Sequence, residues 1–122
     1  MKGRWLLTTY KKTVGDFGED LVEEYLRNKD YDILDRNFRK PFGEIDIIAR
    51  IDEIVVFVEV KTRKNKYFAN PREAVTISKQ QKIIKASQAY LIENDLTDSI
   101  IRFDVAEVIR VDGEINYIEN AF

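Results

Sequence analysis

The chain has 122 residues and a formal net charge of −2; 44% of its residues are hydrophobic and 11% are aromatic. This size suits one hydrophobic core, so we expect a single domain over residues 1–122. The chain contains no cysteine and no histidine, which excludes disulfides, thiolate zinc sites and nucleophiles that need an imidazole base. Any chemistry would need carboxylates, lysines, hydroxyls or a hard metal ion.

The chain begins with a short polar segment followed by an amphipathic helix. Residues 1–12 carry too short an apolar patch for a secretory signal, and we expect them to be disordered. Thr13 and Asp16 resemble a capping box, and apolar residues recur at helical spacing up to Leu26. This pattern predicts a helix over about 14–28. Since no run approaches the ~20 apolar residues that cross a bilayer, we expect a cytoplasmic protein with no membrane partner.

Three strands are predicted next, within residues 31–63, because this stretch is rich in β-branched and aromatic residues. Turns are expected at 41–43 and at 51–54, and the third strand is apolar on both faces, which is typical of a central strand. Ser78 and Gln81 form a second capping pattern and predict a helix that ends near Asn94. Two further strands, 100–111 and 114–118, flank the hairpin turn signal Asp112-Gly113.

The order is therefore helix, three strands, helix, two strands. A strand, a helix and a further strand in succession favour parallel pairing of the two strands through a right-handed crossover. The sequence thus predicts an α/β fold in which helices flank a mixed sheet.

The turn at 51–54 also predicts which residues face each other in its two strands. If the turn is centred on Asp52 and Glu53, the numbers of facing residues sum to 105, so Asp46 faces Glu59 and Glu44 faces Lys61. These four charged side chains then share one face, and the apolar residues Ile45, Ile47 and Ala49 share the other. Like charges directly opposite each other are destabilising, so the pair of Asp46 and Glu59 needs a counter-charge.

A divalent cation is one candidate for this counter-charge, because Mg²⁺ is usually held by one or two carboxylates together with substrate phosphate oxygens. Lys61, on the same face as Glu59, would then stabilise charge on a reacting phosphate. Together these groups form a minimal site for metal-assisted phosphodiester hydrolysis. The alternative is a solvated sheet face on which Lys61 and Arg63 form ion pairs worth ~0–1 kcal/mol each.

Positive charge is concentrated in one part of the chain. Residues 61–85 contain eight basic residues and one acidic residue, so this stretch has a net charge of +7 although the whole chain is at −2. Such a stretch either tracks the phosphates of a nucleic acid or forms an ordinary solvated surface. The candidate nucleic-acid-binding residues are Arg63, Lys64, Lys66, Arg72, Lys79, Gln80 and Lys82.

Several motifs resemble a known family. Asp46, then twelve intervening residues, then Glu59-Val60-Lys61 resembles the signature of the PD-(D/E)XK nuclease superfamily, with Ile45 where the signature has proline. Other segments, in the same order, are similar to the YraN-like family of bacterial proteins. They are Gly18-Glu19, Arg36 to Arg39, Gly43 to Ala49, Val56 to Arg63, Lys79 to Lys82 and Asn120 to Phe122.

This resemblance implies a restriction-endonuclease-like fold and a relationship to archaeal Holliday-junction resolvases. It implies that Asp46 and Glu59 bind Mg²⁺ or Mn²⁺, that Lys61 is the catalytic lysine, and that Glu19 completes the acidic site. Glu44 is a further candidate acid. Glu19 could equally be a solvated residue paired with a basic side chain.

Three functions remain open from the sequence. The first is a metal-dependent DNA endonuclease that acts on branched or single-stranded DNA and needs no small-molecule cofactor. The second is a nucleic-acid-binding module with a catalytically silent nuclease fold, and the third is an interaction protein whose acidic surface meets a partner. Symmetric cleavage of a junction would favour a homodimer.

Overall fold

The computed structural model describes residues 14–65 and 75–122. In chain order, the elements of these ranges are α2 (Val14–Asn28), β1 (Asp32–Lys40), β2 (Gly43–Ile51), β3 (Ile54–Arg63), α3 (Ile77–Glu93), β4 (Ile100–Ile109) and β5 (Ile115–Ile118). The predicted element order is confirmed. The expectation for residues 1–12, and the cap proposed at Thr13, lie outside the described residues. Neither helix of the described ranges is long and apolar enough to cross a membrane.

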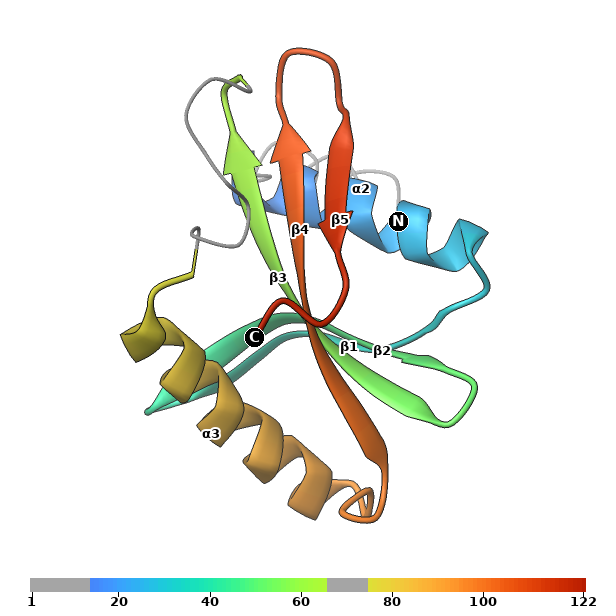
Figure 1. Cartoon of the computed structure of the whole chain (residues 1–122), viewed down its shortest axis with the longest axis vertical. Coiled ribbons are helices and arrows are strands. Elements are labelled where there is room, and N and C mark those ends of the chain that lie inside the picture. The colour runs from blue at the N-terminus through green and yellow to red at the C-terminus, as the bar shows by residue number, and fades with distance from the viewer. Residues whose placement is uncertain (1–13, 66–74) are drawn as a thin grey trace, which may run out of the picture.

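The strands form one mixed sheet in the order β1-β2-β3-β4-β5, so β3 is central as predicted. β3 pairs in parallel with β4, whereas the other neighbours are antiparallel. The parallel pair is connected through α3, as the strand-helix-strand pattern predicted. Figure 1 shows that the sheet is strongly twisted, with the β1–β2 hairpin running across the direction of β4 and β5.

The two helices cover opposite faces of this sheet. Tyr90 of α3 packs edge-on against Phe57 of β3, with ring centroids 6.2 Å apart. Val22 of α2 belongs to a second buried cluster that contains Val58. Because Phe57 and Val58 are consecutive in β3, their side chains point to opposite faces. Accordingly α2 lies behind β3, β4 and β5, and α3 packs on the β1–β2 hairpin (Figure 1).

The start of α3 differs from the prediction. Its N-cap is Thr76, whose hydroxyl accepts a hydrogen bond from the Lys79 amide (3.2 Å), and the capping pattern at Ser78 is wrong. Thr76 has the extended backbone of an N-cap residue, with ψ of 159°, so the helix begins before Ser78. The predicted end is confirmed, because Asn94 is the C-cap.

Gly43 allows β2 to approach the backbone of α3. A Cβ atom at this position would collide with the carbonyl group of Lys82, which cannot move without shifting the helix. We therefore expect Gly43→Ala to lower the free energy of unfolding by about 1–3 kcal/mol, the usual cost of overpacking.

Urea denaturation checks this expectation. Gly113→Asn is the matched control, because a side chain at Gly113 would meet open space and asparagine tolerates its left-handed φ of 72°. A Gly43→Ala variant that is as stable as the control would show that β2 and α3 are not this close.

Candidate active site

The regular pleat of β2 is broken at Asp46. Ile45 packs in the core beneath α3 and Ile47 in the core beneath α2, although residues two apart in a regular strand share a face. In β1, opposite this point, Asn37 has a left-handed φ of 54°. The expectation that Ile45 and Ile47 share a face is therefore wrong, because the strand rotates at Asp46.

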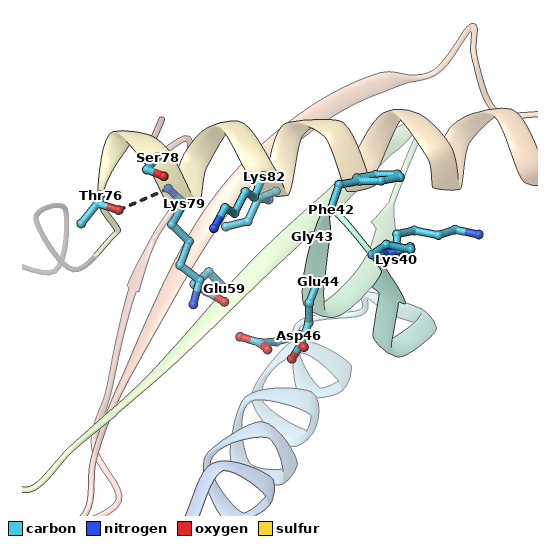
Figure 2. Close-up of a pocket in the computed structure, with 12 residues that line it drawn as sticks. Lys40, Phe42, Gly43, Glu44, Asp46, Glu59, Thr76, Ser78, Lys79 and Lys82 are labelled. Atoms are coloured by element: carbon cyan, nitrogen blue, oxygen red, sulfur yellow. Dashed lines mark hydrogen bonds and ion pairs between the residues drawn. The ribbon is translucent and has the colours of Figure 1, made fainter.

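The pairing of β2 with β3 ends just before the acidic residues. The predicted register is confirmed as far as the pair of Ile47 and Val58. Beyond it, the Val60 amide donates a hydrogen bond to Oδ2 of the Asp46 side chain (2.8 Å). The carboxyl groups of Asp46 and Glu59 lie near each other at the base of a pocket (Figure 2). The two acids are therefore brought together by side-chain contact rather than by a strand pair.

The groups around Asp46 shift the pKa of its carboxyl group. Burial, a hydrogen bond with Glu59 and repulsion by the Glu59 carboxylate raise the pKa of Asp46 from 3.8 to about 9, against the opposing effect of the Val60 amide. Two carboxylates this close cannot both be ionised without a large free-energy cost unless a cation lies beside them. The pair is therefore a site that attracts either a proton or a cation.

Glu59 forms an ion pair with Lys79. Glu59 is only 4% exposed, and the ammonium of Lys79 lies 2.8 Å from Oε2 of the Glu59 carboxylate. Apart from this contact, Oε2 has no hydrogen-bond donor within the described part of the chain. Because buried polar atoms need partners, this oxygen depends on the Lys79 ammonium.

Lys61 follows Glu59 on the same face of β3. Burial and the nearby charge of Lys79 lower the pKa of Lys61, and the attraction of Glu59 only partly offsets them. No carboxylate oxygen of residues 14–65 or 75–122 lies within 4.0 Å of its ammonium in an ion pair. Lys61 is thus a cation beside the acids that is available to an anionic ligand.

The two further candidate acids each meet an arginine, and Glu44 lines the same pocket as the pair. Glu19 on α2 is buried and forms an ion pair with Arg36 (3.3 Å), and burial raises its pKa. The negative charge of Glu19 contributes to the raised pKa of Asp46. Even so, the described residues contain no group of three acids that could together hold a metal ion. Glu44 is exposed, and its carboxylate lies 3.5 Å from Nε of Arg39. The predicted pairing of Glu44 with Lys61 is wrong, because the pairing of β2 with β3 ends before these residues.

A pocket of about 610 Å³ opens above the acid pair. Its floor contains Asp46 and Glu59, and its wall is the first turns of α3, with Lys79 and Lys82 (Figure 2). Lys40, at the end of β1, also lines it. The pocket thus combines buried carboxylates with lysines and a helix N-terminus, and such a terminus favours bound anions.

The other predicted nucleic-acid-binding residues are in different surroundings. Arg63 forms an ion pair with the buried Glu107 (3.1 Å), and Gln80 donates to the Val75 carbonyl (3.1 Å). Lys64 is exposed at the end of β3. Lys66 and Arg72 lie outside the described residues. Of this set, Lys79 and Lys82 line the pocket.

Sequence reasoning did not identify the contact between Lys79 and Glu59, nor the acids buried in β4. Asp104 is fully buried and accepts hydrogen bonds from Arg102, the Tyr117 hydroxyl (2.6 Å) and the Asn120 amide (2.9 Å). The signal in the sequence was an acid within the apolar strand at 100–109. Because both carboxylate oxygens of Asp104 accept hydrogen bonds, this residue links the C-terminal segment to the sheet.

The fold of the described residues defines the class of the protein. Their five-stranded mixed sheet with one helix on each face, in this order along the chain, is the restriction-endonuclease-like arrangement. Residues 18–108 match the family described as "Uncharacterised protein family UPF0102". The chain belongs to this family, which is the YraN-like family that its motifs resemble.

Individual relatives match over most of their length. A UPF0102 protein of Clostridioides difficile is 47% identical over 111 residues, which cover 91% of this chain and 97% of the relative. A UPF0102 protein of Alkaliphilus oremlandii is 49% identical over 115 residues, which cover 91% and 98%. One from Clostridium perfringens is 47% identical over 117 residues, which cover 93% and 96%. These names state no activity or substrate.

Proposed function

We propose that this protein is a divalent-metal-dependent endonuclease that hydrolyses phosphodiester bonds in DNA. The observation that carries the proposal is the pair of half-buried Asp46 and buried Glu59 at the floor of a pocket lined by lysines, with the Lys61 cation near both acids. Carboxylates and a lysine in this arrangement suit the charges of a phosphodiester and of a cation bound to it.

The residues of the acid pair fit Mg²⁺ or Mn²⁺. Oε2 of Glu59 is buried with a single lysine ammonium as its partner among the described residues, and Asp46 is a second carboxylate next to it. Mg²⁺ commonly takes one or two carboxylates from a protein and completes its shell with waters and phosphate oxygens. When bound, such an ion would polarise a phosphoryl oxygen and lower the pKa of a coordinated water.

The remaining groups of the pocket act on the substrate directly. Lys61 would stabilise the negative charge that develops on the reacting phosphate. Lys82, which lines the pocket, would hold a neighbouring phosphate of the same strand, whereas the Lys40 ammonium is paired with Glu93 (2.6 Å). Because these contacts recognise phosphates rather than bases, they position the DNA backbone without selecting a sequence.

The experiment is cleavage of labelled duplex, single-stranded, flapped, forked and four-way-junction DNA with Mg²⁺ or Mn²⁺. We expect cleavage of a branched or single-stranded substrate by the wild type and none by Glu59→Gln, which keeps the side-chain shape but removes the charge. Glu114→Gln, at the exposed β4–β5 connection, is the matched control and should cleave normally. Absence of cleavage for every substrate and either metal would contradict the proposal.

One observation favours a second candidate, a nucleic-acid-binding module with a silent site. Lys79 already neutralises Glu59, so the floor of the pocket has a counter-ion of its own. Such a module would bind DNA in a salt-sensitive way, and Asp46→Asn would leave that binding unchanged or improve it. Binding without cleavage in the same panel would select this candidate.

A further inference from the structure

The buried acids of the described residues differ in the cation that each one meets. Glu19, Glu59, Asp104 and Glu107 are buried. Three of them meet an arginine: Glu19 meets Arg36, Asp104 meets Arg102 and Glu107 meets Arg63.

Glu59 is the exception, because its cation is Lys79. A guanidinium matches a carboxylate with a rigid planar fork, whereas a lysine is a point charge on a flexible four-carbon stem. Oε2 of Glu59 also has this single partner among the described residues, while Asp104 accepts several hydrogen bonds. Among these buried acids, Glu59 therefore has the counter-ion that is easiest to displace.

Lys79 is well placed to move its ammonium without moving its backbone. Its amide is fixed by the Thr76 hydroxyl at the start of α3, and the side chain reaches down the pocket wall to Glu59 (Figure 2). The side chain is 46% exposed although its carboxylate partner is only 3% exposed. One end of the ion pair is thus open to the pocket while the other is buried.

We propose that Lys79 is an internal counter-ion that competes with the divalent cation for Glu59 and turns into the pocket when the cation binds. This inference rests on the proposed function, because it concerns the same carboxylate. Two cations at one buried oxygen repel each other, so binding of the metal must displace the ammonium. The displaced ammonium then faces the pocket, where a phosphate of the substrate supplies its new partner.

Displacement would couple metal binding to substrate binding. While Lys79 is paired with Glu59, its charge is already neutralised, and the pocket attracts phosphate less strongly. Once the metal has replaced the Lys79 ammonium at Glu59, the pocket gains one free ammonium. Metal and DNA would therefore strengthen each other's binding, and this coupling is reciprocal.

The test is calorimetric titration of Mn²⁺ into the purified protein without DNA. Lys79→Gln removes the competing ammonium. We expect the Mn²⁺ dissociation constant of this variant to be about tenfold lower than that of the wild type, the factor that corresponds to ~1.4 kcal/mol. Lys79→Arg should weaken Mn²⁺ binding instead, because a guanidinium holds the carboxylate more firmly. Lys82→Gln removes the same charge from the same pocket and should give a clearly smaller gain than Lys79→Gln.

Thermal unfolding of the same variants without metal shows that the ion pair exists. Lys79→Gln should lower the melting temperature, because Glu59 is left buried without its cation. An unchanged melting temperature would overturn the proposal.

The titration separates this inference from the proposed function. If Lys79→Gln binds Mn²⁺ no more tightly than the wild type while Asp46→Asn abolishes binding, the counter-ion role is wrong and the metal site stands. If neither the wild type nor Lys79→Gln binds Mn²⁺, the metal site fails and the counter-ion role fails with it.

Discussion

Asp46→Asn is expected to make the metal-free protein more stable and to remove its stabilisation by Mn²⁺. Asparagine keeps an oxygen that can accept from the Val60 amide and adds an amide that can donate to Glu59, without a second negative charge. At neutral pH the wild type must take up a proton at Asp46 on folding, and asparagine avoids this cost, so we expect the free energy of unfolding to rise by about 1–3 kcal/mol. Mn²⁺, in contrast, stabilises only a folded protein that binds it.

The gain in stability should depend on pH. The pKa of Asp46 is raised in the folded protein to about 9, whereas in the unfolded chain the group ionises near 3.8. Folding therefore takes up a proton between these values, and the stability of the wild type falls as the pH rises through this window. The advantage of Asp46→Asn should accordingly be small near pH 4 and should grow towards pH 9.

Urea denaturation at pH 5, 7 and 8.5, with and without Mn²⁺, measures both effects. Asp52→Asn is the matched control, because it makes the same substitution at the exposed β2–β3 turn, where asparagine tolerates the φ of 52°. If Asp46→Asn destabilises the protein, or if its gain is the same at every pH, the two carboxylates do not repel each other as the structure indicates.

Lys61→Ala is expected to reduce the rate of DNA cleavage by about 10²–10³-fold, the usual cost of removing one group that stabilises a developing negative charge. Its effect on DNA affinity should be much smaller, because Lys79 and Lys82 line the pocket and remain in this variant. The physical reason is that charge builds up on the phosphate mainly in the transition state, so Lys61 contributes more there than in the bound ground state.

Single-turnover cleavage and equilibrium binding, measured on the same substrate, separate these effects. Lys29→Ala serves as the control for loss of one positive charge, because Lys29 lies beyond the end of α2 and outside the pocket lining. A Lys61→Ala variant that loses binding and cleavage in equal proportion would assign Lys61 to DNA binding alone.

The sequence predicted the elements of this fold because its hydrophobic pattern is local and regular. The third strand is apolar on both faces and proves to be central, and Asp112-Gly113 marks the hairpin of β4 and β5. The β2–β3 register followed from the length of one turn and holds as far as Ile47 and Val58, whereas Asp46 meets Glu59 through side chains and not as the predicted strand pair. Short-range patterns were therefore sufficient for the architecture.

The details of the site depend on contacts that no local pattern encodes. Ile45 appears on the unexpected face because the pleat breaks at Asp46, and strand alternation assumes an unbroken pleat. The N-cap is Thr76 and not Ser78. Both residues carry a hydroxyl just before the same helical pattern, so the sequence alone could not distinguish them. Lys79 meets Glu59 only because α3 folds back over the strand, so the basic stretch could not show which of its lysines is paired.

The most direct test of a metal site at Asp46 and Glu59 is the anomalous diffraction of Mn²⁺ in crystals grown with that ion. We expect an anomalous peak between the two carboxylates, with the Lys79 ammonium turned away from Glu59. No peak there in crystals that hold Mn²⁺ elsewhere, with Lys79 still on Glu59, would contradict the proposed metal site.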